Sequence, residues 1–288
     1  MPLKLIAIDL DGTLLNSKNA ISPRTETAIR RAAESGIVVT IATGRMYRSA
    51  LAIAQKLGLD VPLITYNGAL VCSVSGKTYY HRPIPESLAH KVMELFKGMG
   101  WYIQTYLDDT LYVRSLDEKA KAYAVIAGVE AIPLGDALYT LEGEPTKMLG
   151  IADSPEEAGA MCESLKTDFG TKLFIAISQA PNAAYVEICH PEVSKGKALA
   201  MLAQNLSIKK EEIMAIGDSG NDVSLLDAAG IPVAMANARS EVKERAQIIT
   251  KSNDEDGVAL IIESALEARP QNTRSCAPLL PHQETREP

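Results

Sequence analysis

The chain has 288 residues, enough for two domains or one large one, and its content of 47% hydrophobic and 23% charged residues is that of an ordinary soluble globular protein. Its formal net charge of −7 argues against electrostatic binding to nucleic acid or to an anionic membrane surface. No apolar run reaches the roughly 20 residues of a membrane span, and the N-terminus shows no secretory leader, so we expect a cytoplasmic protein.

The first predicted strand covers residues 5–8 and runs directly into two carboxylates, Asp9 and Asp11. Residues two apart in an extended chain point to the same side, so we expect both carboxylates to project together from the carboxyl end of the strand, where open α/β sheets bind ligands. Like charges this close need a compensating cation, and carboxylate oxygens suit a hard cation such as Mg²⁺. Gly12 allows a tight turn and Thr13 offers a hydroxyl. A solvated acidic turn is the alternative interpretation of this short motif when it stands alone.

The second predicted strand, residues 37–42, ends in Thr43-Gly44-Arg45 and is followed by a predicted helix. A hydroxyl and a glycine at such a strand-to-helix junction can present an oxygen and backbone N–H groups to an anion. An ordinary turn is the alternative. A third predicted strand, residues 63–66, leads into the turn Asn67-Gly68.

Beyond residue 84 the alternation of strand and helix changes its pattern. The segment Arg82-Pro83-Ile84-Pro85 precedes the change and His190-Pro191 closes it, and we expect these proline-bearing segments to be hinges. The helices and strands predicted between them indicate an inserted α+β domain, residues 85–189. We interpret three of its aromatic side chains as core rather than as a platform for a sugar: Trp101, Tyr102 and Tyr106.

The pattern of a parallel sheet returns after residue 190. Lys195 opens a predicted helix, and a predicted strand over residues 212–216 runs into Gly217-Asp218-Ser219-Gly220-Asn221-Asp222. The predicted core therefore comprises residues 1–84 and 190–268. Residues 269–288 are rich in proline and have no hydrophobic periodicity, so we expect a disordered tail there.

The cysteines and histidines are scattered, and none has the spacing of a zinc site. We therefore expect buried or inert thiols and assign no catalytic histidine. The cysteines are Cys72, Cys162, Cys189 and Cys276.

Three separated segments supply the parts of a phosphoryl-transfer site. Asp9 is a candidate nucleophile, Asp218 and Asp222 add carboxylates after another strand, and Lys195 can neutralise both a phosphate and the crowded acids. Carboxylate nucleophiles transfer phosphoryl groups through an aspartyl-phosphate, and the charge of the transferred group is then met by Mg²⁺ and lysine.

Five motifs stand out together: Asp9-Leu10-Asp11-Gly12-Thr13-Leu14, Thr43-Gly44-Arg45, Asn67-Gly68, Ser194-Lys195-Gly196 and Gly217-Asp218-Ser219-Gly220-Asn221-Asp222. They resemble the motifs of the haloacid dehalogenase superfamily, and within it those of the Cof-type phosphatases with a large αβ (type IIB) cap. The resemblance extends to about residue 268. It implies an α/β fold, with a Rossmann-like, doubly wound parallel-sheet core and an inserted α+β cap. It also implies a Mg²⁺-dependent phosphatase, a phosphoric monoester hydrolase, that acts through an aspartyl-phosphate on a small phosphorylated metabolite such as a sugar phosphate.

The resemblance implies a role for each matched catalytic or metal-binding residue. Asp9 would be the nucleophile and a Mg²⁺ ligand. Asp11 would protonate the leaving oxygen, and its backbone carbonyl would bind Mg²⁺. Asp218 would complete the metal site, and Lys195 would bridge the phosphate and Asp9.

Further matched residues would surround the phosphate. Those implied to contact it are Leu10, Thr43, Gly44, Lys195 and Asn221. Asp222 would orient Lys195 or a water on the metal, whereas Arg45 and Asn67 would shape the site. The structural alternatives are a charge at a helix N-terminus for Asp222 and a surface cation for Arg45.

Two other functions are compatible with the same scaffold. A phosphomutase would return the phosphoryl group to a sugar instead of passing it to water, and a non-enzymatic phospho-receiver also uses an acidic cluster with threonine and lysine. Asp11 and the large insertion argue against the receiver, because a general acid promotes turnover. A dehalogenase is disfavoured because cleavage of a C–halogen bond needs no acid there. The sequence leaves open the substrate, the cap residues that select it and the oligomeric state.

Overall fold

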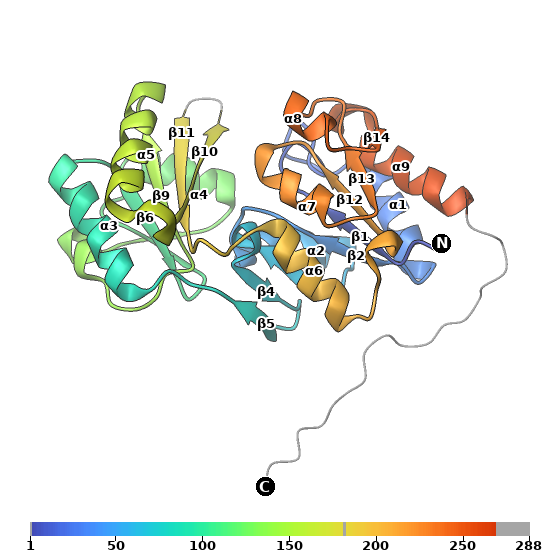
Figure 1. Ribbon diagram of the computed structural model, residues 1–288, viewed down its shortest axis with the longest axis horizontal. Coiled ribbons are helices and arrows are strands. Elements are labelled where there is room, and N and C mark those ends of the chain that lie inside the picture. The colour runs from blue at the N-terminus through green and yellow to red at the C-terminus, as the bar shows by residue number, and fades with distance from the viewer. Residues whose placement is uncertain (1, 181–182, 269–288) are drawn as a thin grey trace, which may run out of the picture.

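The structure is a computed structural model that describes residues 2–180 and 183–268. The predicted tail, residues 269–288, lies outside the described residues, as does Cys276. In Figure 1 the five-stranded sheet and its helices occupy one side of the view, and the elements from α3 to β11 occupy the other.

A five-stranded sheet has the strand order β14-β13-β12-β1-β2, and all neighbouring pairs are parallel. Its strands are β1 (Leu5–Ile8), β2 (Val38–Ile41), β12 (Ile213–Gly217), β13 (Ile231–Ala234) and β14 (Ile248–Ile249). Every residue of β1, β2 and β12 is buried. Such continuously apolar strands are typical of a parallel sheet that is covered on both faces.

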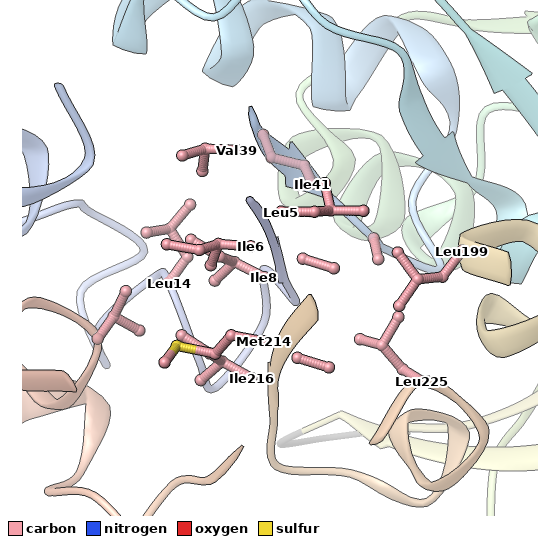
Figure 2. Packing of buried hydrophobic residues seen from close by; sticks show 14 of the residues in the cluster. Leu5, Ile6, Ile8, Leu14, Val39, Ile41, Leu199, Met214, Ile216 and Leu225 are labelled. Carbon is pink, nitrogen blue, oxygen red and sulfur yellow. The ribbon is translucent and has the colours of Figure 1, made fainter. Parts of the chain in front are cut away.

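Helices cover this sheet: α1 (Pro23–Glu34), α2 (Tyr47–Leu57), α6 (Lys195–Asn205), α7 (Val223–Asp227), α8 (Ser240–Lys243) and α9 (Gly257–Glu267). Helix α1 begins where the sequence encodes a cap, since the Ser22 side chain accepts a hydrogen bond from the backbone of Thr25. Figure 2 shows the alternation of the strands: Ile8 and Ile216 point to one side, and Leu199 of α6 and Leu225 of α7 pack on the other.

A small antiparallel sheet follows β2 and α2. It contains β3 (Leu63–Thr65), β4 (Leu70–Cys72) and β5 (Thr78–His81), in that order. A single parallel bridge from Ala42 to Ile64 joins it to the end of β2. This bridge brings the turn after β3 next to the turn after β2, where candidate phosphate-binding residues lie.

A six-stranded sheet is formed by the residues between the two proline-bearing segments. It has the order β10-β11-β9-β6-β7-β8 and is antiparallel except for the pair β7–β8. Its strands are β6 (Ile103–Leu107), β7 (Thr110–Val113), β8 (Ala131–Pro133), β9 (Lys147–Ala152), β10 (Phe174–Ala180) and β11 (Ala183–Cys189). Its helices are α3 (Glu86–Met99), α4 (Glu118–Ala127) and α5 (Pro155–Phe169). Helices α3 and α5 lie on the outer side of this sheet, whereas α4 lies on the side of the five-stranded sheet (Figure 1).

Short 3₁₀ helices complete the described elements: η1 (Tyr66–Gly68), η2 (Gly135–Thr140), η3 (Gly170–Lys172), η4 (Lys210–Glu212), η5 (Gly220–Asp222) and η6 (Asn253–Glu255). Strand β8 was not predicted, because it has three residues and ends in Pro133, which lacks the N–H that a strand needs for pairing.

The predicted fold class is confirmed: an α/β protein with a parallel-sheet core and an additional α+β part. The predicted domain boundaries, between residues 84 and 85 and between 189 and 190, stay a prediction. Trp101 and Tyr106 are buried, as expected of core residues, and Trp101 packs edge-on against Phe96 with ring centroids 5.6 Å apart. Tyr102 is half-buried and donates a hydrogen bond to Gln104 Oε1.

The described cysteines, Cys72, Cys162 and Cys189, are free and buried, as expected. Within residues 2–180 and 183–268, none of the helices has the length and apolar character that crossing a membrane would require.

Candidate active site

Three carboxylates converge at the carboxyl ends of two adjacent strands. Strands β1 and β12 are paired in parallel, with Ile8 opposite Ile216, so the residues that follow them meet at one edge of the sheet. Asp9, Asp218 and Asp222 each place one carboxylate oxygen within 4.8 Å of the others. Asp9 and Asp222 are buried, and Asp218 is half-buried.

Lys195 supplies the positive charge of this cluster. It is the first residue of α6, and the preceding Ser194 caps the helix by accepting a hydrogen bond from the backbone of Lys197. Its Nζ donates to Asp9 Oδ1 at 2.5 Å and to Asp222 Oδ1 at 2.6 Å. Burial alone would lower the pKa of Lys195, but the Asp222 and Asp9 carboxylates outweigh burial and raise it. The side chain therefore stays an ammonium.

The carboxyl groups of Asp9 and Asp218, by contrast, ionise with difficulty. Burial and the neighbouring Asp222 raise the pKa of Asp9 well above its usual value despite the opposing charge of Lys195. Burial raises the pKa of Asp218 to about 6, although the hydrogen bond from Thr13 lowers it. Among the described residues, three carboxylates thus share one ammonium. This surplus of negative charge, carried by oxygen donors, fits a hard divalent cation such as Mg²⁺.

The loops around Asp218 and Asp222 are tightly fitted. Thr13 Oγ1 donates to Asp218 Oδ1 at 2.7 Å, and Asp222 Oδ2 accepts hydrogen bonds from the backbone of Asp218 and Ser219 at 3.1 and 3.0 Å. Gly12 has a φ of +79°, and a Cβ atom there would collide with the Asp218 carboxylate. The bond from Lys195 is the contact that the expected orienting role of Asp222 requires, and that role stays a prediction.

Asp11 does not lie where the strand pattern predicted. Strand β1 ends at Ile8, so the alternation of side chains does not continue to Asp11. The Asp11 carboxylate instead accepts two hydrogen bonds from Arg45, from Nε at 2.9 Å and from Nη2 at 2.5 Å. The expectation that Asp9 and Asp11 project together is therefore wrong for the side chains, and Asp222 takes the third place in the cluster. Arg45 is not a surface cation, because its side chain is only 13% exposed.

Two of the candidate phosphate-binding residues, Gly44 and Asn221, meet around Asn67. Its Oδ1 accepts a hydrogen bond from Asn221 Nδ2 at 2.9 Å, and a Cβ on Gly44 would lie 2.9 Å from the same oxygen. Asn67 has a φ of +58°, a left-handed conformation that asparagine tolerates better than most residues. Thr43 is buried and its Oγ1 accepts a hydrogen bond from the backbone of Arg45.

Leu10, which lies between Asp9 and Asp11 in the sequence, is buried. Its carbonyl accepts a hydrogen bond from the backbone of Leu15 at 2.8 Å. The structure thus brings Asp9, Lys195, Asp218 and Asp222 into one cluster and Gly44, Asn67 and Asn221 into another.

Two residues next to the second cluster were missed by the sequence analysis, Lys147 of β9 and Glu187 of β11. Glu187 Oε2 accepts hydrogen bonds from Asn67 Nδ2 at 2.5 Å and from Lys147 Nζ at 3.0 Å, and Lys147 Nζ also donates to the Gly44 carbonyl at 3.3 Å. Both are buried. Burial would raise the pKa of Glu187, but Lys147 and the hydrogen bonds outweigh it and lower the pKa. The sequence did offer one signal for these two residues, because each is a charged residue in an otherwise apolar strand segment.

A second contact joins the same two parts of the chain. Tyr66 Oη donates to Asp109 Oδ1 at 2.7 Å, and the backbone N–H of Arg48 donates to Asp109 Oδ2 at 2.9 Å. Asp109 lies in the turn between β6 and β7. The six-stranded sheet is thus attached to the turns after β2 and β3 at two separate points.

The chain matches the family model of the haloacid dehalogenase-like hydrolases over residues 6–262. It belongs to this family. Because the match covers both parts of the fold, the whole described chain, and not the core alone, is that of a haloacid dehalogenase-like hydrolase.

Several named relatives of this hydrolase are phosphatases. It is 33% identical over 287 residues to phosphatase YwpJ of Bacillus subtilis, covering 92% of this chain and 100% of the relative. It is 32% identical over 284 residues to a B. subtilis protein named 5-amino-6-(5-phospho-D-ribitylamino)uracil phosphatase YwtE, covering 92% and 98%. The solved structure of a sugar phosphatase of haloacid dehalogenase subclass IIB superimposes with a TM-score of 0.76 at 26% identity, covering 91% and 98%. These likenesses confirm the predicted superfamily, its Cof-type IIB branch and the predicted enzyme class, a phosphoric monoester hydrolase.

Proposed function

We propose that this hydrolase is a Mg²⁺-dependent phosphatase that acts on a small phosphorylated metabolite through an aspartyl-phosphate on Asp9. The observation that carries the proposal is the cluster of the Asp9, Asp218 and Asp222 carboxylates, in which one ammonium, that of Lys195, bonds to Asp9 and Asp222. The phosphatase names of the relatives support the reaction class.

Asp9 is the proposed nucleophile. Lys195 fixes its Oδ1, so the second carboxylate oxygen is the one that attacks phosphorus. A bond forms between this oxygen and phosphorus while the bond from phosphorus to the leaving oxygen breaks. Water then attacks the same phosphorus, which regenerates the Asp9 carboxylate and releases inorganic phosphate.

Asp11 is the proposed general acid. It gives a proton to the leaving oxygen in the first step and takes one from the attacking water in the second. In the structure Arg45 donates hydrogen bonds to both carboxylate oxygens of Asp11. A substrate must therefore draw Asp11 away from Arg45 before Asp11 can reach the leaving oxygen.

The phosphate would be held by groups that lie beside Asp9. We propose the Lys195 ammonium, the Thr43 hydroxyl, the backbone N–H groups of Leu10 and Gly44 and the Asn221 side-chain amide, with Asn67 holding Asn221 in place. Asp9, Asp218 and the backbone carbonyl of Asp11 would hold Mg²⁺. When bound, the metal ion supplies positive charge that stabilises the charge on the transferred phosphoryl group.

The residues from 85 to 189 are the proposed cap. Its contacts through Glu187 and Asp109 place the six-stranded sheet against the candidate phosphate-binding turns. A cover at this position would keep water from the reacting groups, which strengthens their electrostatic interactions.

A panel of phosphate esters assayed for released inorganic phosphate tests the proposal. We expect hydrolysis with Mg²⁺, loss of hydrolysis with excess EDTA, and little effect of reagents that block thiols. A phosphomutase would convert one sugar phosphate into an isomer without releasing phosphate. Full activity in excess EDTA would contradict the metal-dependent mechanism.

A further inference from the structure

We infer that the substrate carries its phosphate on an apolar body, aliphatic or aromatic, rather than on a polyhydroxylated sugar. The inference rests on the proposed phosphatase function and adds the chemical class of the leaving group. It comes from a cleft of about 330 Å³ lined by α2, by the end of α4 and by the loop that follows β1. This volume is within the range of small-molecule sites.

One wall of the cleft is a stripe along α2. The residues that line it, Ser49, Ala52, Ile53 and Lys56, occupy positions i, i+3, i+4 and i+7 of the helix and therefore share one face. The middle of this face consists of Ala52 and Ile53, and Lys56 stands at its outer end. The loop after β1 adds the apolar side chains of Leu15 and Ile21.

The opposite wall is the C-terminal turn of α4. It presents Val125, which is 81% exposed, and Ile126, which is 47% exposed. Single exposed apolar residues are common, but these two face other apolar side chains across a gap that a ligand can fill. Helix α4 lies between the six-stranded and the five-stranded sheet (Figure 1), so the cleft has one wall from each part of the fold.

Arg45 connects the cleft to the candidate active site. Its side chain lines the cleft, and its guanidinium is bonded to Asp11 and to Asn19 Oδ1. Because Asp11 is the proposed acid for the leaving oxygen, the rest of the leaving group must begin beside Asp11 and Arg45. The cleft gives it space there. Arg45 and Asn19 are thus at the end near Asp11, Lys56 is at the other end, and the walls between them are mainly apolar.

This distribution of polar groups favours one class of substrate. Each methylene group that is transferred from water to apolar walls improves binding by about threefold to fourfold. A sugar would instead place several hydroxyls against Ala52, Ile53, Val125 and Ile126, whose side chains offer no hydrogen bonds. Every hydroxyl left without a partner costs about tenfold or more in affinity.

The test uses esters that differ in their bodies but share one phosphate group: ethyl, butyl and hexyl phosphate, with sorbitol 6-phosphate as the polyhydroxylated counterpart of the hexyl ester. With Mg²⁺ we expect kcat/KM to rise about threefold per methylene from the ethyl to the hexyl ester. Hexyl phosphate should exceed sorbitol 6-phosphate by at least about tenfold.

A matched pair of variants locates the effect. Ile126→Ser should lower the ratio of the hexyl to the ethyl rate by about tenfold, because it removes part of the apolar wall. Ile249→Ser changes a residue of similar exposure, 57%, on β14, which does not line the cleft, and should leave the ratio and both rates unchanged. Melting temperatures of the two variants verify that both are folded.

Hydrolysis of all four esters without dependence on chain length, or with a preference for sorbitol 6-phosphate, would overturn this inference and leave the proposed function standing. Absence of hydrolysis of every ester would overturn the proposed function. Binding to the cleft is then measured by calorimetry with ethyl- and hexylphosphonate, which cannot be hydrolysed at phosphorus. Tighter binding of the hexyl compound supports the apolar site, and equal binding refutes it.

Discussion

Lys147 and Lys195 are both almost completely buried, at 3% and 1% exposure, and both have a raised pKa, yet their surroundings differ in charge. Lys147 pairs with one carboxylate in the described part of the chain, that of Glu187. Lys195 contacts two, and Asp218 adds a third within the same cluster. One lysine therefore belongs to a balanced ion pair, and the other to a group with surplus negative charge.

The difference separates two uses of a buried lysine. A balanced buried ion pair is stabilised only when its polar atoms are fully hydrogen-bonded. Glu187 meets this condition, because Asn67, Lys147 and Ser178 all donate to its carboxylate. Burial, together with the neighbouring carboxylates, leaves Asp9 and Asp218 with raised pKa values, which a folded protein tolerates where function requires it. Substitutions at these charged residues test this contrast.

Asp9→Asn should lower turnover by more than about a thousandfold, because the amide cannot form the covalent intermediate. The amide is isosteric, so Lys195 keeps an oxygen acceptor and the melting temperature should change little. Steady-state rates and thermal unfolding of the same preparation measure both. A variant that keeps more than a few per cent of activity would show that Asp9 is not the nucleophile.

Lys195→Met and Lys147→Met should each reduce the free energy of unfolding by about 3–5 kcal/mol, because each leaves buried carboxylate charge without its partner. They should respond differently to Mg²⁺. The metal ion should recover part of the loss in Lys195→Met, since it can replace the missing positive charge.

In Lys147→Met, by contrast, Mg²⁺ should increase the free energy of unfolding only by as much as it does in the unmodified protein. Thermal unfolding with EDTA and with Mg²⁺ provides the comparison. If Mg²⁺ stabilised the two variants equally, the surroundings of Lys195 would have no more surplus negative charge than those of Lys147.

Asp218→Asn should stabilise the metal-free protein at pH 8. The pKa of Asp218 is raised in the folded protein from its ordinary value of 3.8 to about 6, so its ionisation above pH 6 costs at most about 3 kcal/mol of unfolding free energy. Below pH 3.8 the group is protonated in both states and the cost vanishes.

The gain from Asp218→Asn should therefore shrink as the pH falls from 8 towards 4, measured by urea unfolding in EDTA. The same variant should lose most of the stabilisation by Mg²⁺. A variant less stable than the unmodified protein at pH 8 would contradict the assigned surplus of charge.

The double variant Lys147→Met/Glu187→Gln should be the mildest of these changes. It removes both charges together, and the new amide oxygen can still accept the hydrogen bond from Asn67. We expect a stability within about 1 kcal/mol of the unmodified protein and activity within about tenfold. Complete loss of turnover in a stable double variant would show that the pair takes part in the reaction, as Lys195 is proposed to do.

Local signals in the sequence predicted much of the fold. The apolar strands at residues 5–8 and 213–217 are continuous because a parallel sheet buries both of their faces, and Ser22 marks the start of α1 because its hydroxyl caps the helix. The convergence of Asp9 with Asp218 followed from one rule, that the carboxyl ends of parallel strands share an edge of the sheet.

Features that depend on the turn geometry or on pairing of distant segments could not be predicted. The direction of the Asp11 side chain depends on the point where β1 stops and on a hydrogen bond to Arg45, 34 positions away. Lys147 and Glu187 meet because β9 pairs with β11, and they reach Asn67 only when the six-stranded sheet packs against the core. The cleft requires α2 and α4 to face each other, which no local periodicity encodes.

The central position of β1 also affects how the candidate active site is assembled during synthesis of the chain. Strand β1 pairs with β2 on one side, but its partner on the other side, β12, begins at Ile213. Thr13 and Asp218, which are hydrogen-bonded in the folded protein, lie 205 positions apart, so roughly 10–40 s separate their synthesis at ribosomal speeds of about 5–20 residues per second. During that time one edge of an apolar strand has no native partner, which exposes the nascent chain to wrong pairing. A chain released before residue 213 would carry Asp9 and Lys195 but neither Asp218 nor Asp222, and so an unfinished product would lack two of the three carboxylates of the candidate active site.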